Sequence, residues 1–374
     1  MIYIHIPFCK QKCSYCNFHF STSLKYKEEM IASIKKEILL RKDELKHKKL
    51  QSLYFGGGTP SILGVDELKS IIDEVLKYFT FQEDIEITLE ANPDDLDKTF
   101  LKELSTSHVN RLSIGTQSFF EEDLKLMNRA HSSSQAEDSI KRAQDFGFEN
   151  LSIDLIYGSP TSNFEIWKQN LQKAVDLQVP HISSYALTVE PKTALENWIS
   201  KGKIKSPQES EQNQEFYFMS DFLKEKGFEH YEISNFAKSG FHSKHNSAYW
   251  QYKEYLGIGP SAHSYDGQSS RSWNVANNQQ YIKNLQQNVL PKETEVLTEK
   301  EKFNEMMMIG LRTIWGVDIS NFAKDFSDEV IQHFNKETSL KLQEEMLMIE
   351  NHHLKIPEKH WFLADGIAAD LFII

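Results

Sequence analysis

The sequence is poor in cysteine and has no long apolar segment. Only three cysteines occur in 374 residues, and all of them fall between positions 9 and 16. No run approaches the roughly 18 apolar residues that a membrane-spanning helix needs. The N-terminal residues, MIYIHIPFCK, lack the basic segment that opens a signal or transit peptide. We therefore expect no transmembrane segment and a cytoplasmic protein, whose thiols stay reduced.

The sequence also has fewer basic than acidic residues. Lys and Arg total 42 against 54 for Asp and Glu, which gives a formal net charge of −12. An acidic average of this kind disfavours contact with phosphate backbones, so nucleic acid is not an expected partner. An odd number of cysteines in one short segment is unlike a disulfide framework and favours metal ligation.

Six β-type runs alternate with amphipathic helical stretches through the first two hundred residues. The runs are apolar or β-branched and are bounded by Gly, Pro, Asn or Asp: 2–6, 52–55, 85–90, 111–115, 151–156 and 182–187. Helical spacing is clearest over 66–79, where apolar residues recur at i, i+3 and i+4. Six βα units predict a parallel sheet covered by helices, either doubly wound or an open barrel.

The positions of the unusual residues favour the barrel. Residues 9–16, residues 56–59, Glu90 and Gln117 lie at or just after the ends of the first four strands, and Asp154 lies in the fifth. Barrel enzymes carry their chemistry at this end of the strands. We expect the barrel to span residues 1–235, followed by an extension over 236–296 and a small α-rich domain over 297–374. Residues 200–214 predict an exposed connection, and residues 230–236 predict a further strand.

The three cysteines follow the pattern C-x3-C-x2-C and supply three thiolates from one loop: Cys9, Cys13 and Cys16. A 4Fe–4S cluster held in this way keeps one iron without a protein ligand. The amino and carboxylate groups of S-adenosylmethionine can fill that position, and an electron from the cluster can then cleave the sulfonium bond. The alternative is zinc, with His19 as fourth ligand, in an interaction protein without redox chemistry.

Two further features belong to the same strand ends. The glycines of Gly56-Gly57-Gly58-Thr59-Pro60 allow a ligand to approach the backbone, although a tight turn between strand and helix also uses glycine. Asp154 lies in an apolar strand, where a carboxylate is costly without a partner. That partner is either a ribose hydroxyl or Arg129, and a purely structural ion pair is an equal alternative.

The motif HNSAYW at 245–250 stands apart from these strand ends. His245 could ligate a haem iron, with Tyr249 and Trp250 stacking on the macrocycle. Residue types alone favour a structural histidine instead. His131, His181, His263 and the pair at 352–353 give weaker signals.

Seven motifs together resemble the radical-SAM oxygen-independent coproporphyrinogen III oxidase-like family, and within it the haem chaperones most closely. The motifs occur in the family's order along nearly the whole chain: YIHIPFCKQKCSYCNF, FGGGTPS, LEANP, GTQSF, MNRAH, IDLIYG and HNSAYW. The resemblance implies an α/β fold, an incomplete (β/α)6 TIM-like barrel with an added C-terminal domain. It also implies that Cys9, Cys13 and Cys16 ligate the cluster. It assigns S-adenosylmethionine contacts to Tyr3, Tyr15, Gly57 and Glu90, and contacts to a second such molecule to Gly58, Thr59, Gln117, Arg129 and Asp154.

Two departures separate this chain from the true oxidase. Phe18 stands where the oxidase has a further cysteine, and Tyr3 is almost terminal, whereas the oxidase carries a segment before this strand. The resemblance therefore implies a haem chaperone that binds haem as cargo near His245 and passes it to an apo-haemoprotein. The alternative is a radical-SAM enzyme on a tetrapyrrole, by oxidative decarboxylation of coproporphyrinogen III or by opening of the haem ring.

Overall fold

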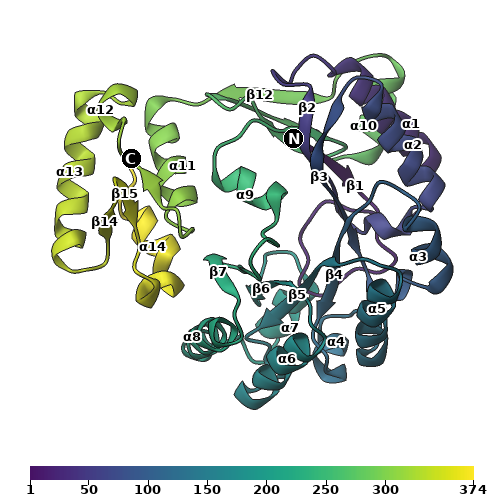
Figure 1. Ribbon diagram of the computed structural model, residues 1–374, viewed down its shortest axis with the longest axis horizontal. Coiled ribbons are helices and arrows are strands. Elements are labelled where there is room, and N and C mark those ends of the chain that lie inside the picture. The colour runs from purple at the N-terminus through teal and green to yellow at the C-terminus, as the bar shows by residue number, and fades with distance from the viewer.

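The computed structural model describes residues 1–374, and its centre is a curved nine-stranded sheet in the order β7-β8-β6-β5-β4-β3-β2-β1-β9 (Figure 1). Six consecutive strands are parallel neighbours in sequence order: β1 (Ile2–Ile6), β2 (Lys49–Gly57), β3 (Thr80–Ala91), β4 (Arg111–Gln117), β5 (Asn150–Tyr157) and β6 (His181–Ala186). A doubly wound sheet reverses its strand order, and this sheet does not. The predicted incomplete (β/α)6 barrel is therefore confirmed.

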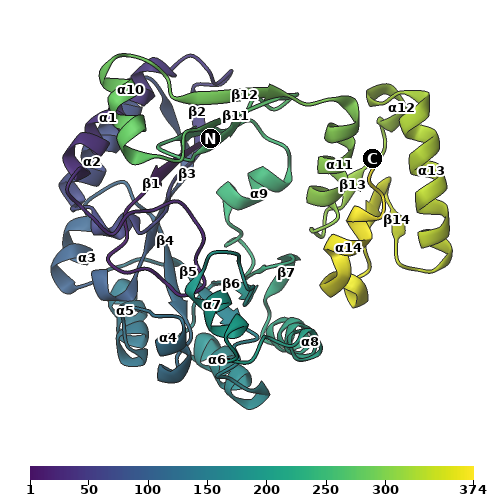
Figure 2. The same ribbon diagram turned by 180° about the vertical axis from the view of Figure 1, so that it is seen from behind.

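Helices cover the outer face of this sheet (Figure 2). They are α1 (Lys27–Leu40), α2 (Val65–Leu76), α3 (Lys98–Leu104), α4 (Glu121–Leu126), α5 (Ser133–Asp145), α6 (Phe164–Asp176) and α8 (Glu209–Glu225), with short 3-10 turns at Pro60–Ile62 and Pro93–Asp95. Helix α7 (Ala194–Ser200) lies instead beside the cysteine loop, where the backbone of Leu195 donates to the carbonyl of Ser14 at 2.9 Å. Helix α2 buries the apolar stripe of Leu68, Ile71 and Val75 that the sequence predicts. Helix α5 begins at Ser132, whose side chain accepts a hydrogen bond from the backbone of Gln135 in a capping box.

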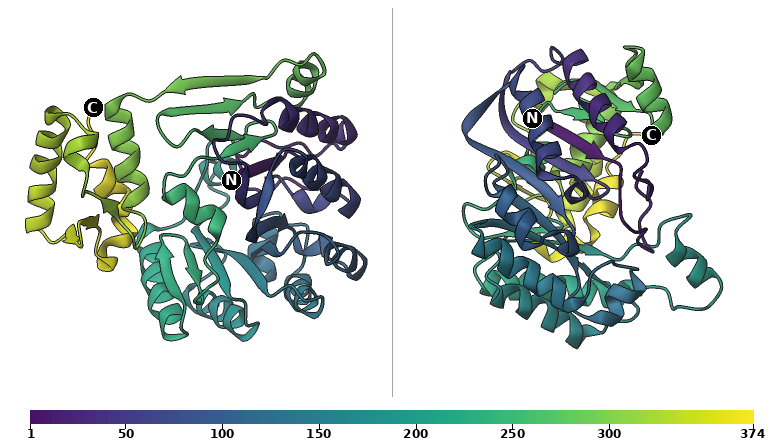
Figure 3. Two further views of the ribbon diagram at one scale, coloured as in Figure 1. Left: turned by 45° about the horizontal axis from the view of Figure 1, so that its top comes forward. Right: turned by 90° about the vertical axis from the view of Figure 1, so that its right-hand side faces the viewer.

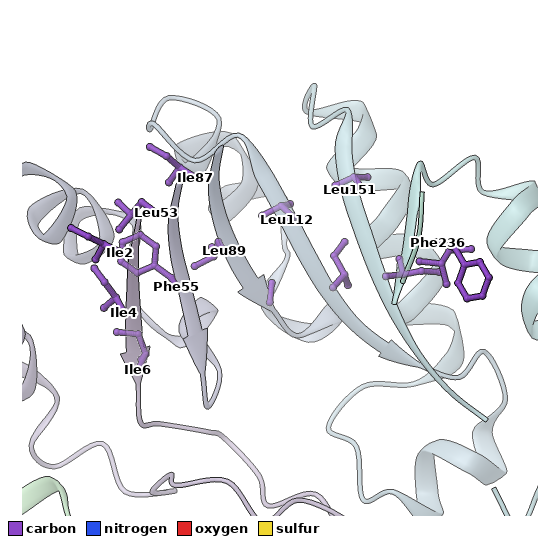
Figure 4. Close-up of a cluster of buried hydrophobic side chains, with 14 of the residues drawn as sticks. Ile2, Ile4, Ile6, Leu53, Phe55, Ile87, Leu89, Leu112, Leu151 and Phe236 are labelled. Atoms are coloured by element: carbon purple, nitrogen blue, oxygen red, sulfur yellow. The ribbon is translucent and has the colours of Figure 1, made fainter. Parts of the chain in front are cut away.

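The strands alternate between apolar and polar residues, which sorts their side chains between two faces. Figure 4 shows the apolar set across neighbouring strands, including Ile2, Ile4, Ile6, Leu53, Phe55, Ile87, Leu89, Leu112 and Leu151, all of them buried. The residues between them face the concave side, among them Ser52, Tyr54, Glu90, Ser113 and Asp154. Asp154 thus interrupts an apolar strand because it belongs to the polar face, as a period of two requires.

Both edges of the sheet carry short additions. Strand β9 (Leu256–Ile258) lies parallel to β1, while β8 (Asn235–Ala237) and β7 (Glu229–Glu232) are antiparallel additions beyond β6. The prediction of one strand over 230–236 is therefore wrong, because the chain reverses between β7 and β8. The predicted connection over 200–214 is also too long, since α8 begins at Glu209.

The segment after β8 forms a cap over one side of the barrel. It contains α9 (Lys244–Trp250), α10 (Asn278–Gln286) and an antiparallel sheet of β10 (His263–Tyr265), β11 (Ser270–Asn274) and β12 (Lys292–Val296). A buried ion pair at the C-terminal end of α1 contacts this segment. Arg41 donates to Glu37 of the same helix at 2.8 Å and to the carbonyl of Gly257 at 2.7 Å.

The C-terminal unit is α-rich, as predicted, and also contains a small sheet. Its helices are α11 (Glu299–Gly310), α12 (Phe322–Asp325), α13 (Asp328–Gln343) and α14 (Ala364–Ala369), with a 3-10 turn at Glu358–Leu363; its strands are β13 (Val317–Asp318), β14 (Met348–Glu350) and β15 (His353–Lys355). It lies beside the barrel and follows directly from β12 (Figure 3). Backbone hydrogen bonds join it to β7 and the residue that follows: Ile314 donates to the carbonyl of Tyr231 at 3.1 Å, and Ile233 donates to the carbonyl of Arg312 at 2.9 Å. No helix in the protein has the length and apolar character to cross a membrane.

Candidate functional site

The cysteine-bearing loop between β1 and α1 is held by the segment that follows α4. Ser14 donates from its backbone to the carbonyl of Met127 at 3.0 Å and from its hydroxyl to the carbonyl of Leu126 at 2.7 Å. Gln11 donates to the carbonyl of Asn128 at 2.8 Å, and Asn128 donates in turn to the carbonyl of Lys12 at 2.7 Å. Side chains from two distant parts of the sequence therefore fix the loop without any ligand.

The glycine run holds the same loop from the other side. The backbone N–H of Gly58 donates to the carbonyl of Ile6 at 2.9 Å, and that of Thr59 donates to the carbonyl of Phe8 at 2.7 Å. Gly57 has φ +105°, and a Cβ on Gly58 would lie 2.5 Å from the carbonyl oxygen of Phe8. Both glycines are thus required by the turn itself, whether or not a ligand also uses it.

One cavity collects nearly all of the predicted site residues at the C-terminal ends of the strands. Its predicted members are Cys9, Cys13, Tyr15, Cys16, Gly57, Gly58, Thr59, Glu90, Gln117, Arg129 and Asp154. It is completed by Phe18, which the sequence analysis named only as a departure from the oxidase, and by residues that it did not single out: Gln11, Phe20, Ala91, Asn92, Ser113 and Gly115. Of the predicted set, only Tyr3 and His245 lie elsewhere.

The three cysteines are free thiols and half-buried in this cavity. Burial raises the pKa of Cys9 to about 11, so its thiolate requires a nearby positive charge or a metal. No three His, Cys, Asp or Glu side chains are gathered closely enough to enclose a single metal ion. The zinc alternative also loses its fourth ligand, because His19 lies outside the cavity and its Nε2 is hydrogen-bonded to Asn278 at 2.8 Å. Three thiols that line one cavity without a fourth protein ligand could hold a 4Fe–4S cluster that keeps one iron free of protein ligands.

Arg129 contributes the cation of this cavity. Its guanidinium lies 3.3 Å from the sulfur of Cys13 and donates to Asn92 at 2.7 Å and to the carbonyl of Gly115 at 2.8 Å. No ion pair joins it to Asp154, so that possible pairing is wrong. The LEANP motif contained Asn92, but nothing in the residue types singled out its amide as the partner of Arg129.

Two carboxyl groups on the cavity wall have raised pKa values. Burial raises the pKa of Glu90 to about 7, and the carboxylate accepts a hydrogen bond from the hydroxyl of Tyr54 at 2.8 Å. Burial also raises the pKa of Asp154 to about 6, and Ser113 donates to it at 3.3 Å. Buried carboxyls of this kind are suited to hydrogen-bond neutral polar groups such as ribose hydroxyls.

Gln117 also lines this cavity, and its backbone conformation is strained. Its φ is +64°, which is uncommon outside glycine, and it lies where the register of β4 against β5 shifts. The register shift redirects the strand end toward the cavity, and such strain is typical of functional sites.

Tyr3 and His245 belong to an aromatic column inside the barrel. The ring of Tyr54 stacks on Tyr3 at 6.0 Å and on His245 at 4.8 Å between ring centroids. His245 is 1% exposed, and its ring nitrogens are hydrogen-bonded to Ser52 at 2.9 Å and to the hydroxyl of Tyr249 at 3.0 Å. Through Tyr54 and Glu90 the column reaches the cysteine-lined cavity.

A second and larger cavity, of about 1020 Å³, opens on the far side of this column. We call it the aromatic cavity because Tyr and Trp rings line it: Tyr185, Tyr249, Trp250, Tyr252, Tyr255, Tyr265 and Trp273. Helix α11 closes it with Glu305, Met308 and Ile309, and Arg312 follows that helix. The sequence signalled the HNSAYW part of this cavity and, more weakly, His263, since the other residues come from distant segments without a shared spacing.

Comparison with known proteins agrees with this architecture. Residues 3–183 match the model of the radical SAM superfamily, and residues 297–363 match that of the HemN C-terminal domain. The chain is 35% identical to the heme chaperone HemW of Bacillus subtilis, over 87% of this chain and 86% of the relative. It is 32% identical to the heme chaperone HemW of Lactococcus lactis, over 98% of this chain and 95% of the relative.

A solved structure shares the whole fold. The radical SAM coproporphyrinogen III oxidase HemN of Escherichia coli superposes with a TM-score of 0.84 at 22% identity, over 99% of this chain and 89% of that one. At this identity the likeness speaks for the fold alone. The extent and identity of the match to the HemW relatives decide the family: this chain belongs to the radical SAM family of the heme chaperone HemW.

Proposed function

We propose that this protein is a radical-SAM haem chaperone, which binds haem and passes it to an apo-haemoprotein. The observation that carries the proposal is the aromatic cavity beside the cysteine-lined one, in a chain whose relatives are named heme chaperones. Flat macrocycles bind well between Tyr and Trp rings, and sites of this size accommodate large cofactors. Lys253 adds a positive charge for the haem propionates, whereas Arg271 is paired with Glu295 and Glu305, and Arg312 with Asp365.

In this proposal Cys9, Cys13 and Cys16 hold a 4Fe–4S cluster, and S-adenosylmethionine binds beside it. When bound, such a cluster supplies a low-potential electron and an iron that accepts the methionine groups of the cofactor. The chain's own residues orient the molecule: Gly57, Gly58 and Thr59 offer backbone groups, and Glu90, Gln117 and Asp154 accept or donate hydrogen bonds. Arg129 balances negative charge next to Cys13.

Tyr15, Phe18 and Phe20 line the cavity around the cysteines and limit the access of water to a cluster. Tyr3 acts indirectly in this proposal, since it touches the site through Tyr54 and Glu90. Polar residues of both predicted sets line this one cavity, and one molecule of S-adenosylmethionine satisfies the chemistry.

The oxidase alternative is not favoured. Phe18, at the position of the oxidase's further cysteine, is 71% exposed at the rim of the cysteine-lined cavity. A phenyl group can neither ligate iron nor exchange a proton, so that contribution to coproporphyrinogen chemistry is missing. We also propose the division into residues 1–235, 236–296 and 297–374, and side chains from all three parts line the aromatic cavity. The cytoplasmic location stays a prediction.

The experiment uses full-length protein purified and reconstituted without oxygen. Iron, sulfide and zinc content are measured, and ferric haem is then titrated while absorbance and tryptophan fluorescence are followed. We expect one cluster per chain, stoichiometric haem binding and transfer of the haem to added apomyoglobin. Zinc at the cysteines or the absence of saturable haem binding would overturn the proposal.

Two substitutions make the test specific to the aromatic cavity. Trp250→Ala removes a ring that lines the cavity, whereas Trp198→Ala removes a half-buried ring on α7 outside it. Only the first should weaken haem binding. Equal effects of the two would show that haem binds at some other surface.

A further inference from the structure

A second groove opens beside the cysteine loop, and its rim is basic. We infer that this groove is the docking surface of an acidic one-electron carrier protein, which delivers its electron at Cys16. The inference rests on the proposed function, since it concerns the reduction of the cluster proposed at the cysteines. It follows from the lining of the groove, from the charges around it and from an exposed aromatic ring.

The groove and the cysteine-lined cavity share one wall. Cys16, Phe18 and Phe20 line both spaces, and the groove has a volume of about 840 Å³. Cys9 and Cys13 line only the cavity. Of the three proposed cluster ligands, Cys16 is therefore the one that a protein seated in the groove can contact.

Unpaired lysines lie at the rim of the groove. Lys12 and Lys192 line it, and both are exposed and form no ion pair. The one carboxylate in its lining, that of Glu190, accepts a hydrogen bond from the amide of Asn17 at 2.7 Å. The groove therefore presents positive charge that no ion pair within the protein neutralises.

More lysines follow in the segment after α7, which lies beside the cysteine loop. Ile204 packs against the same apolar cluster as Tyr15. The exposed lysines around Ile204 form no ion pair: Lys201, Lys203 and Lys205. They extend the basic surface away from the groove along one side of the cysteine loop.

The charge of this surface is opposite in sign to that of the whole protein. Residues 9–22 and 186–207 together contain six lysines against two glutamates, whereas the chain has a formal net charge of −12. Among these lysines only Lys10 is paired, with Asp94 and Asp95. A local charge of this kind attracts an acidic partner and orients it during its approach.

Phe18 gives the basic surface an apolar centre. Its side chain is 71% exposed, which makes it the most exposed Phe, Tyr or Trp side chain of the protein. Protein interfaces commonly place an apolar or aromatic contact inside a polar rim. Complexes that form only for electron transfer bury little area, so one exposed ring within a charged rim is sufficient for them.

Two other uses of the groove agree less well with its lining. S-adenosylmethionine has a sulfonium and an ammonium group against one carboxylate, so unpaired lysines do not favour its entry here. An anionic bilayer would be attracted by the lysines, but it carries no electron to a groove that leads to Cys16. A protein that carries both negative charge and an electron accounts for the whole lining.

The step transfers one electron and no atom. A reduced plant-type ferredoxin, an acidic protein with a low-potential [2Fe–2S] centre, loses one electron, and the oxidised 4Fe–4S cluster gains it. No bond is formed or broken between the two proteins. This ferredoxin therefore serves as the probe of the surface.

Binding to the full-length, cluster-free protein tests the surface without any activity of the cluster. Oxidised, fluorescently labelled ferredoxin is titrated at low ionic strength, and its anisotropy gives the dissociation constant. Lys192→Glu/Lys203→Glu should weaken binding at least about tenfold, because two attractive charges become repulsive. The matched control is Lys102→Glu/Lys226→Glu, which reverses two exposed, unpaired lysines that do not line the groove and should bind like the wild type.

Stopped-flow reduction of the reconstituted protein then tests the delivery of the electron. The second-order rate constant with reduced ferredoxin should fall in Lys192→Glu/Lys203→Glu but not in the control. In the wild type it should fall as the ionic strength rises, because salt screens the attraction. Photoreduced 5-deazaflavin, a small reductant that needs no docking surface, should reduce all three proteins at the same rate.

The inference is overturned if the wild-type protein binds no ferredoxin, or if the two double variants bind it equally well. It is also overturned if Lys192→Glu/Lys203→Glu loses only its binding to phosphatidylglycerol vesicles, which would indicate a membrane-facing surface. Should this variant fail to fold by circular dichroism, Lys192→Gln/Lys203→Gln is measured instead, with an expected weakening of at least about threefold. Protein that takes up no cluster would refute the proposed function itself, an outcome that ferredoxin binding to the cluster-free protein keeps separate.

Discussion

The guanidinium of Arg129 lies 3.3 Å from the sulfur of Cys13, the middle cysteine of the loop. The segment that carries Arg129 also supplies the carbonyls of Leu126 and Met127 that hold Ser14. One short stretch after α4 therefore both shapes the cysteine loop and places a positive charge beside a thiol. This arrangement links the MNRAH motif to the cysteine motif through direct contacts.

Arg129→Met removes that charge while it keeps an unbranched side chain. We expect less iron and sulfide to be retained after reconstitution, because a buried thiolate loses its nearest cation. Arg129→Lys, which keeps the charge but cannot reach several partners at once, should be intermediate. Lys125→Met, at an exposed position of α4, is the control. Metal content and chelator resistance are measured; full retention in Arg129→Met would contradict the role.

Ser14→Ala tests how far the loop is fixed without a cluster. The substitution leaves the carbonyl of Leu126 without its 2.7 Å hydrogen bond in a buried place. The free energy of unfolding of the cluster-free protein should fall by about 1–3 kcal/mol. Urea unfolding followed by circular dichroism measures it. Thr22→Ala, at an exposed loop position without hydrogen bonds, should change it little, and equal values for both would exclude the anchoring role.

Gly58→Ala tests the close approach of the glycine run to the cysteine loop. The added Cβ would lie 2.5 Å from the carbonyl oxygen of Phe8, so the loop must move. We expect a loss of about 1–3 kcal/mol in stability, as for other overpacked sites, and poorer cluster retention. Gly64→Ala is the control, because its Cβ would meet only the flexible end of Glu67 at 3.7 Å. Normal metal content and stability in Gly58→Ala would rule out the steric constraint.

The barrel and the cysteine-lined cavity could be predicted because both follow from local patterns. Strands of period two and helices of period 3.6 define the βα units, and parallel strands bring their ends to one edge. Residues as distant in the sequence as Cys9 and Asp154 therefore line the same cavity, as the pattern predicts. The possible pair of Arg129 with Asp154 does not form because Arg129, in the loop after α4, donates instead to Asn92 and to the carbonyl of Gly115, which residue types alone do not reveal.

The aromatic cavity could not be predicted in this way. Tyr185 comes from the barrel, Tyr265 from the cap and Met308 from the C-terminal unit, and no periodicity relates them. Their proximity depends on how whole units dock, which is set by contacts such as that of Ile233 with Arg312. His263 gave a weak signal for the same reason, since its neighbours are remote in the sequence.

Glu232→Gln tests a buried carboxyl at the edge of the aromatic cavity. Burial raises the pKa of Glu232 to about 7 from an ordinary value of 4.5, although Asn235 and the more distant Arg312 oppose the shift. The folded protein therefore holds a proton that the unfolded chain has lost between these values. Its stabilising effect is complete below pH 4.5 and is lost as the pH rises through 7.

We expect wild-type and Glu232→Gln proteins to have similar stability at pH 5 and to diverge toward pH 8. The variant should then be more stable, by on the order of 3 kcal/mol at most, because it buries no carboxylate. Thermal unfolding across this pH range measures the difference. Glu293→Gln, at an exposed position of β12, controls for net charge. Parallel pH profiles of wild type and Glu232→Gln would contradict the assignment.

The last prediction concerns the contribution of His245 to stability, with the exposed His263 on β10 as the control. His245→Ala removes a buried ring that stacks on Tyr54 and leaves the hydroxyls of Ser52 and Tyr249 without a partner. A cavity together with unsatisfied polar groups should lower the free energy of unfolding by about 3 kcal/mol. His263→Ala, which breaks no hydrogen bond, should lower it by less than about 1 kcal/mol. Urea unfolding of haem-free proteins measures both. Equal stability losses in the two variants would contradict the stabilising role of the buried, hydrogen-bonded His245.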